Sequence, residues 1–199
     1  MPDSVLTSHT EIKSWLGITV TTDDTLLDSL ASSILGRFKS YMGRDILSTA
    51  YTERYNGNGQ MQMTLKQAPI TAITSLTIDE VAIPAATTSQ TYGYMFENST
   101  LYLVSGNPGV SGLPGNAPAR FGRGMRNVYV SYTAGWSTVP ADIKHAATLQ
   151  CAYEYQRQRN AIGMRSENQG QQQTNYITDP FLPGVKLVLD QYKRVATVI

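Results

Sequence analysis

The sequence predicts an α+β fold with about four helices and a small antiparallel β region. Apolar residues recur at three- and four-residue steps between positions 27 and 41, which is the period of an amphipathic helix. Residues 127–133 instead alternate apolar and polar side chains, which is typical of a strand with two different faces. The sequence Asn-Gly-Asn-Gly at 56–59 favours a tight turn between two strands. Helices and strands are therefore both expected.

The segment 127–155 organises the predicted fold, because it reads as a strand, a turn and a helix in succession. Ala134-Gly135 ends the strand. Pro140 then suits the first turn of a helix, since proline has no N–H and its fixed φ is already helical. Asp142 in the same turn faces the positive end of the helix dipole. We expect the other helices and strands to pack on this segment.

Two helices are expected before the first strand. Ser8 and Glu11 have the spacing of a capping box, so a short helix is predicted over residues 8–16. A second helix is expected to open at Thr21–Asp24, where acidic residues favour the first turn, and to end near Gly43.

The strands predicted next are Thr49–Tyr55 and Gln60–Lys66, joined as a hairpin by the Asn-Gly-Asn-Gly turn, and Ala72–Ile78. Residues 81–127 read as irregular. One short strand is expected there at 101–104, and the Gly/Pro-rich stretch from Ser105 to Gly124 is expected to be a loop.

The chain changes character after Tyr155. Residues 156–173 contain several arginines and a run of glutamines but almost no apolar residue, so a polar linker is expected. A final amphipathic helix follows. The predicted organisation is a core over 1–160, which includes the irregular insert of about 81–125, and an attachment over 161–199 made of the polar linker and the C-terminal helix.

Composition excludes several classes of function. The formal net charge is +1 and 16% of the residues are charged, so bulk electrostatics do not indicate a nucleic-acid binder. The single cysteine, Cys151, rules out an intrachain disulfide and a cysteine-based zinc site, and its place on an apolar helix face predicts burial. No apolar run reaches transmembrane length and no leader sequence is evident, so we expect a cytosolic product that is not secreted and has no membrane contact.

Residues for catalysis or metal binding are scarce as well. His9 and His145 have no His or Cys at metal-ligand spacing, which favours solvated or locally bonded histidines. The stretch Gly109–Gly112 falls short of a nucleophile elbow, and the Gly-rich run 106–124 lacks the Gly-Lys-Ser/Thr ending of a phosphate loop. We therefore expect no enzyme activity, no cofactor and no bound metal.

Two features point to binding. Arg120, Arg123 and Arg126 recur every third residue and suit contact with a phosphate backbone, although a solvated loop explains them as well. Tyrosine is abundant, with 12 residues against 4 phenylalanines. The tyrosines around the predicted strands are Tyr92, Tyr94, Tyr102, Tyr129 and Tyr132. They suit either a protein interface or half-buried sheet positions.

Four motifs, in this order, give the chain a resemblance to a known family. They are DDTLLDSLASSILGRFKSYMGRDIL after a short N-terminal helix, the hairpin with PITAITSLTID, the segment VYVSYTAGWSTVPADIKHAATLQCAYEYQRQR, and the closing LPGVKLVLDQYKRV. With them the chain resembles the head–tail connector proteins, or adaptors, of tailed bacteriophages, which join the portal ring to the tail. The region from about Val81 to Met125 departs from the family in its length and its Gly and Pro content.

The resemblance implies a mainly helical bundle of about four helices with a small antiparallel β-sheet or hairpin insert. It implies a structural protein of the virion neck, whose copies form a ring beneath the portal, dodecameric under a dodecameric portal. Such a ring contacts the portal protein and other neck or tail-completion proteins, and it passes the genomic DNA without reading its sequence. Near-neutral charge suits this channel, because dense Lys and Arg would hold DNA by counterion release.

Two candidate sites follow. The segment from Gln156 to Ile199 is expected to contact the portal or a neighbouring subunit, or else to fold back on its own domain. The contact positions expected in it are Leu182, Val185, Leu189, Tyr192, Arg194 and Val195. The three arginines at 120, 123 and 126 are expected to face the DNA channel or the tail. The alternative functions are another neck protein, such as a stopper or tail-completion protein, and a nucleic-acid-binding module that uses the arginine loop.

Overall fold

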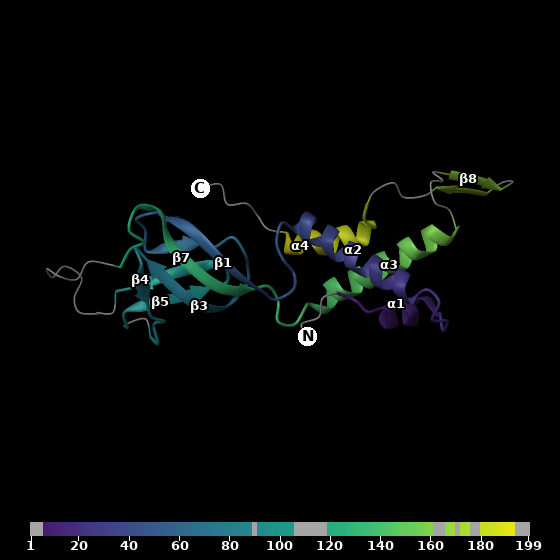
Figure 1. The fold of residues 1–199 in the computed structure, drawn as a ribbon. Coiled ribbons are helices and arrows are strands. Elements are labelled where there is room, and N and C mark those ends of the chain that lie inside the picture. Colours follow the sequence, from purple (N-terminus) through teal and green to yellow (C-terminus); the bar gives the residue numbers. More distant parts are fainter. Residues whose placement is uncertain are drawn as a thin grey trace. The chain divides into compact units, whose positions relative to one another are not determined.

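The computed structural model describes residues 6–88, 91–105, 119–160, 166–169, 172–175 and 180–193. The chain divides into two compact units (Figure 1). The first, called the helical unit, takes residues 1–44 and 138–199, and the second, called the β unit, is the continuous stretch 45–137. The β unit is thus inserted between two parts of the helical unit.

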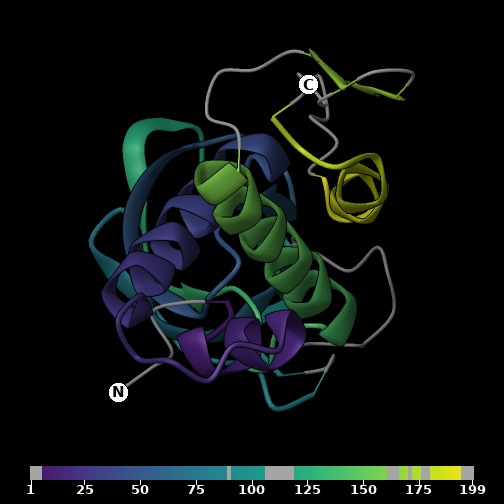
Figure 2. The same cartoon turned by 90° about the vertical axis from the view of Figure 1, so that its right-hand side faces the viewer.

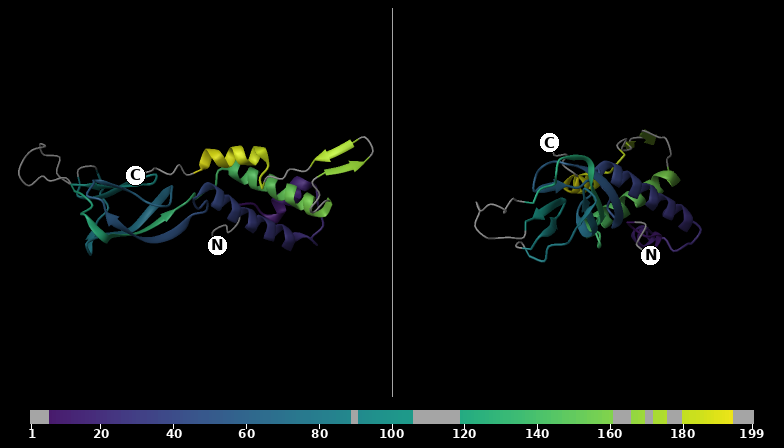
Figure 3. Two further views of the ribbon diagram at one scale, coloured as in Figure 1. Left: turned by 90° about the horizontal axis from the view of Figure 1, so that it is seen from above. Right: turned by 60° about the vertical axis from the view of Figure 1, so that its left-hand side comes forward.

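Four helices build the described part of the helical unit: α1 (His9–Leu16), α2 (Asp24–Met42), α3 (Ala141–Asn160) and α4 (Pro183–Tyr192). α2 and α3 pack side by side, α1 contacts both, and α4 lies against α2 and α3 (Figure 2, Figure 3). Apolar side chains from all four helices are buried in this unit, among them Ile12, Leu27, Ile34, Phe38, Ile143, Ala147, Val185 and Leu189. The four predicted helices are therefore confirmed.

The helix ends confirm the local sequence signals. The Ser8 side chain accepts a hydrogen bond from the Glu11 N–H (3.2 Å), and the Glu11 carboxylate accepts one from the Ser8 N–H (2.9 Å). These two bonds complete the predicted capping box. Gly17 and Gly43 follow α1 and α2 with φ of 68° each. This left-handed conformation costs glycine little, so both residues end their helices as expected.

Two antiparallel sheets build the described part of the β unit. The four-stranded sheet has the order β1-β7-β3-β4, with β1 at Thr49–Gly57, β7 at Gly124–Ala134, β3 at Ile70–Ile78 and β4 at Val81–Ile83. The three-stranded sheet has the order β2-β6-β5, with β2 at Gln62–Thr64, β6 at Thr100–Val104 and β5 at Gly93–Glu97.

One apolar core joins the two sheets. β7 lies within it, because Val128, Val130 and Tyr132 are buried while the residues between them are half-buried. This burial confirms the alternation predicted for residues 127–133. Side chains of other strands complete the core, among them Met63, Ile70, Leu76, Leu101 and Leu103.

The α+β class is confirmed, but the expectation of a mainly helical bundle with a small β insert is wrong. The sheets of four and three strands form a compact unit of their own. Moreover, β4, β5 and β6 lie in the region that was expected to be irregular. β6 confirms the predicted short strand at 101–104, whereas β4 has 3 residues and most of β5 is exposed. Short or exposed strands carry little hydrophobic periodicity, so their sequences do not indicate them. Residues 106–118 of the predicted loop lie outside the described residues.

The predicted hairpin across Asn-Gly-Asn-Gly is also wrong. β1 pairs with β7, with Tyr55 opposite Val128, and β2 pairs with β6. The turn therefore carries the chain from one sheet to the other. Its backbone bonds go to a distant segment, since the Gly59 N–H donates to the Phe121 carbonyl (2.7 Å) and the Phe121 N–H donates to the Gln60 carbonyl (2.8 Å).

The C-terminal part begins as a helix, because α3 continues to Asn160. Two short strands, β8 (Ser166–Gln169) and β9 (Gln172–Asn175), then pair with each other in antiparallel fashion. Of the expected linker over residues 156–173, positions 161–165, 170 and 171 lie outside the described residues, as do Arg194 and Val195. No helix in the described part of the chain is both long and apolar enough to span a bilayer.

Candidate functional site

Of the three predicted arginines, Arg120 and Arg123 lie on the segment that leads into β7, and Arg126 lies near the start of β7 itself. Phe121 in this segment is fully buried in the core of the β unit, whereas Arg120, Arg123 and Arg126 are exposed. Met125 is 86% exposed. We call the three arginines and Met125 the arginine tip. It is an exposed surface of three cationic side chains and one apolar side chain, next to the buried ring of Phe121.

Two asparagines fasten the arginine tip to β1. Asn127 Oδ1 accepts a hydrogen bond from the Gly57 N–H (2.8 Å), and Asn127 Nδ2 donates to the Gly122 carbonyl (2.9 Å). Asn56 Oδ1 accepts from the Arg126 N–H (2.7 Å). Arg126 is held at a φ of 53°, a left-handed conformation that is uncommon for arginine. The tip is therefore held to β1 by hydrogen bonds, and Met125 and Arg126 belong to β7, whereas the glycines in this stretch suggested a flexible loop.

The charges around the arginine tip are mixed. Arg120 donates a hydrogen bond to the Gly59 carbonyl (3.1 Å). Arg126 lines a depression of about 550 Å³. The other residues that line it are Arg54, Thr77, Asp79, Glu80, Asn127 and Tyr129. The Arg54 guanidinium lies 5.5 Å from the centroid of the Tyr129 ring, a distance suited to a cation–π contact. Both cationic and anionic side chains thus border this surface.

The tyrosines considered for an interface lie mostly within the sheets. Tyr94 and Tyr132 are buried, Tyr102 and Tyr129 are half-buried, and Tyr92 is 50% exposed. Tyr132 donates a hydrogen bond to the Glu53 carboxylate (2.8 Å), and burial raises the pKa of Tyr132 to about 12. Tyr132 therefore stays a neutral donor at physiological pH. Four of the five tyrosines therefore occupy buried or half-buried sheet positions, and Tyr92 is the exposed one.

The last helix packs on its own unit. Val185 is 1% exposed and Leu189 is 0% exposed, while Leu182 and Tyr192 are half-buried. Leu187 on the opposite side is 68% exposed. The fold-back that the sequence left open is thus present in the single chain. Contact of these residues with a portal or a second subunit stays a prediction.

Polar contacts fix where α4 lies. Gln150 of α3 is 1% exposed. Its Nε2 donates to the Pro180 carbonyl (3.1 Å) and to Glu154 (2.8 Å), and its Oε1 accepts from the Leu182 N–H (3.1 Å). All of its polar groups are therefore used. Pro180 and Leu182 lie just before α4, so their bonds to this buried amide fix the position of the helix. If α4 lay elsewhere, buried polar atoms would lose their partners.

Aromatic rings and tyrosine hydroxyls also hold α4 against α2 and α3. Phe181 meets the rings of Phe38 and Tyr41 edge to face, at centroid distances of 5.7 and 5.3 Å. The Tyr41 hydroxyl donates to Asp190 (2.6 Å), and the Tyr192 hydroxyl donates to Asp142 (2.7 Å). α4 is therefore held at its start, along its buried face and at its end.

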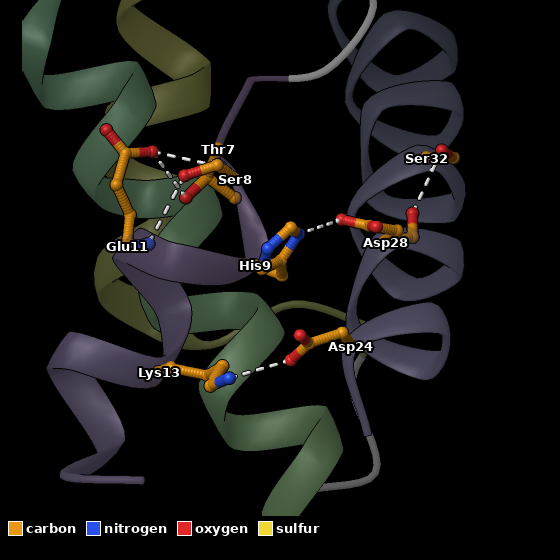
Figure 4. A network of polar contacts seen from close by, with 8 residues as sticks. All are labelled: Thr7, Ser8, His9, Glu11, Lys13, Asp24, Asp28 and Ser32. Atoms are coloured by element: carbon orange, nitrogen blue, oxygen red, sulfur yellow. Dashed lines mark hydrogen bonds and ion pairs between the residues drawn. The ribbon is translucent and has the colours of Figure 1, made fainter. Parts of the chain in front are cut away.

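A polar network joins α1 to α2 (Figure 4). His9 Nδ1 lies 2.9 Å from Asp28, and Lys13 Nζ donates to Asp24 (2.8 Å). The Glu11 carboxylate accepts from Thr7 (3.1 Å) as well as from the Ser8 N–H, and the backbone bond is the main reason why the pKa of Glu11 is lowered. His9 is thus a locally bonded side chain, as expected.

The described residues offer no site for metal chemistry, since no group of three His, Cys, Asp or Glu side chains among them is placed to hold an ion. His145 lies against the ring of Trp15, with centroids 5.2 Å apart. Cys151 is buried, and this burial raises the pKa of its thiol to about 12. A thiol of this kind is protonated at neutral pH and is not a nucleophile.

Two residues that matter for these surfaces were missed in the sequence. Asn127 read as the first residue of a strand, and nothing near it in sequence indicates that its side chain binds Gly57. Gln150 did carry a signal. It stands at a helical spacing from Ile143 and Ala147, which are buried, so a polar residue lies on an apolar face. Such a residue needs partners from another element.

A family model described as "Head completion protein" matches residues 5–195. The chain belongs to the head completion protein family. Its role is therefore structural and not enzymatic. The resemblance to phage head–tail proteins is confirmed at this level, and the finer assignment as an adaptor is taken up below. No curated protein matches the chain.

Solved structures from gene transfer agent (GTA) particles share the fold. A chain in the virion of a native GTA particle has a TM-score of 0.56 at 17% identity, with 95% of this chain and 90% of that chain covered. A chain in the neck of an empty GTA particle, computed with C6 symmetry, has a TM-score of 0.53, 17% identity and coverages of 95% and 90%. A chain in the neck of a native GTA particle, computed with C12 symmetry, has a TM-score of 0.53, 16% identity and coverages of 95% and 89%.

Proposed function

We propose that this protein is an adaptor of the virion neck, whose copies form a ring beneath the portal, join the head to the tail and continue the DNA channel. The observation that carries the proposal is the head completion family match over residues 5–195. The fold shared with chains in necks computed with C6 and C12 symmetry supports a ring, and we propose twelve copies.

The surface of the helical unit suits a subunit of an assembly. Trp15 is 54% exposed, Val20 is 53% exposed and Leu187 is 68% exposed. Large apolar side chains of this kind are costly to leave in water and gain free energy when a partner covers them. The low charge of the chain agrees with this reading, because interface cores are depleted in charged residues.

We further propose that residues 161–199 form the attachment to the portal. Val185 and Leu189 seat α4 on its own unit, so the docked helix presents Leu187 outward. Leu182 and Tyr192, which are half-buried, lie at its two ends and complete the contact. Arg194 and Val195, outside the described residues, continue the chain beyond α4 and belong to the same proposal.

The experiment is native mass spectrometry of the purified protein, alone and mixed with the portal protein of the same particle. We expect a monomer that becomes a ring-sized complex when the portal is added. A protein that stays monomeric and does not bind the portal would contradict the adaptor role. Truncation at Thr174 would test the proposed attachment, but it also removes Val185 and Leu189 from the core. Leu187→Glu is therefore the better test of portal binding, because it changes only the outward face of α4.

Two other functions are separated by their own observations. Another neck protein, such as a stopper or tail-completion protein, would bind a ring that is already mounted on the portal and not the portal itself. A nucleic-acid-binding module would shift labelled duplex DNA at modest concentration, with an affinity that falls steeply as salt rises. The exposed arginine tip is the observation that favours this last reading.

A further inference from the structure

We propose that the arginine tip of one copy docks on strand β5 of a second copy, and that this contact joins the copies around the ring. The inference rests on the proposed ring and names the surfaces that connect its members. The receiving surface, called the β5 patch, consists of Tyr92, Met95, Phe96 and Glu97.

The arginine tip is already shaped for a contact. Phe121 anchors it in the core, and Asn127 ties it to Gly57. The stem of Arg123 packs near Gly59, where an added Cβ would lie 3.1 Å from Arg123 Nε. A surface held in this way loses little conformational freedom when it binds. Met125, 86% exposed beside these arginines, is an adaptable apolar side chain that a partner can cover.

The β5 patch has the complementary chemistry. Tyr92 is 50% exposed, Met95 is 40% exposed and Phe96 is 37% exposed. Glu97 is exposed as well. Met95 and Glu97 are two residues apart on a strand, so they point to the same face of the sheet. Phe96 between them points to the other face, so the part of the patch that meets the tip is Met95 with Glu97. An acidic side chain beside a methionine matches arginines beside a methionine, because Arg–carboxylate pairs can form two parallel hydrogen bonds.

The two surfaces lie on different strands of the β unit. Met125 and Arg126 of the tip belong to β7 in the four-stranded sheet, whereas the patch lies on β5 in the three-stranded sheet. The backbone of Tyr94 in β5 already bonds to Pro84 and Ala86, so the side chains of β5 and not its free backbone edge make the contact. A contact between two different surfaces of identical chains is heterologous, and it generates a ring when the rotation closes. Two different surfaces on each copy are what a head-to-tail series of copies requires.

DNA is a poorer occupant of the arginine tip. Arg120 is already bonded to the Gly59 carbonyl, and Arg126 shares its depression with Asp79 and Glu80. These acids repel phosphate groups and reduce the counterion release on which DNA affinity depends. Met125 gains nothing from a phosphate backbone. A protein surface with both charge and apolar area uses every part of the tip.

The test is a charge exchange between the two surfaces. Arg123→Glu and Glu97→Arg, each alone, are expected to raise the protein concentration needed for half-assembly on the portal by about tenfold or more, because like charges then meet. The double variant is expected to assemble within about threefold of the natural protein, since the pair is restored with reversed sign. Arg123 is chosen because Arg126 has an unusual backbone conformation. Arg157→Glu, at an exposed arginine of α3 in the helical unit, is the control and should not rescue Glu97→Arg.

The outcomes separate this contact from the proposed function. Rings that form on the portal without rescue in the double variant would overturn the contact and leave the adaptor role intact. Loss of labelled-DNA binding in Arg123→Glu that the double variant does not restore would assign the tip to DNA. If the natural protein forms no ring, the adaptor role fails. The contact is then decided by mixing Met125→Cys and Met95→Cys chains under oxidation, where a disulfide between copies supports it and its absence overturns it.

Discussion

The side chain of Asn127 binds the backbone of Gly57, 70 residues earlier, through a 2.8 Å hydrogen bond from the Gly57 N–H to Asn127 Oδ1. This bond closes the end of the β1–β7 pair, where the register shifts between Tyr55 and Gly57. The same side chain donates to the Gly122 carbonyl (2.9 Å). One amide therefore organises the start of β7, the end of β1 and the arginine tip.

Asn127→Ala is expected to lower the free energy of unfolding of the β unit by about 1–3 kcal/mol, because polar groups paired with the amide lose their partner. Urea denaturation, followed by far-ultraviolet circular dichroism, measures this change. Gln62→Ala, an exposed position on β2, is the control. Equal stability of the two variants would show that water replaces the amide without cost.

Gly57→Ala is expected to destabilise the β unit by about 1–3 kcal/mol or more, because its Cβ would lie 1.6 Å from the Gly122 carbonyl oxygen and only backbone movement relieves the clash. Gly36→Ala is the matched control in the middle of α2, where an added Cβ meets nothing within 4 Å. There alanine is expected to stabilise by about 0.5–1 kcal/mol. Thermal melts of both variants check the opposite signs.

Gln150→Leu is expected to loosen α4, since the Leu182 N–H and the Pro180 carbonyl lose their buried partner at a cost of about 1–3 kcal/mol. Hydrogen exchange should rise in α4 before it rises elsewhere in the helical unit. Gln156→Ala, on α3 like Gln150 but at an exposed position, should leave the hydrogen exchange of α4 unchanged. Unchanged protection of α4 in Gln150→Leu would mean that apolar contacts alone seat the helix.

Ser8→Ala is expected to cost about 0.5–2 kcal/mol, because the N-cap bond to the Glu11 N–H is lost. Ser14→Ala, exposed within α1, is the control.

The carboxylate of Glu11, the other member of the capping box, makes stability depend on pH. The pKa of Glu11 is lowered from 4.5 in the folded chain, mainly by the Ser8 N–H. Its contribution to stability is therefore complete above this ordinary value and is lost as the pH falls below it. Glu11→Gln should flatten the fall in helix content that circular dichroism records in acid.

Local signals in the sequence predicted local structure well. Ser8 and Glu11 are three residues apart, and Gly17 and Gly43 act on the helices that directly precede them. Each of these features depends on a few neighbouring residues, so their spacing is sufficient to predict it. The alternation over 127–133 likewise reflects burial on one face of β7.

The errors concern partners far apart in the chain. An Asn-Gly turn between strand-like segments favours a hairpin, but β1 pairs with β7, with Thr49 opposite Ala134. Sequence periodicity carries no information on which strand lies next to which. The arginines at 120, 123 and 126 were found from their spacing, whereas the hydrogen bonds that hold them come from Asn56 and Asn127. Those bonds exist only once β1 has paired with β7, about 70 residues later in the chain.

The insertion of the β unit has a consequence for how the protein is made. Residues 45–137 form a continuous stretch, so every strand of the β unit is synthesised before α3. α2 is made early, but its packing partners α3 and α4 come last. The β unit can thus complete its core while the helical unit still waits for half of its chain. The surface that we assign to ring contacts is then finished before the helix that we assign to the portal exists.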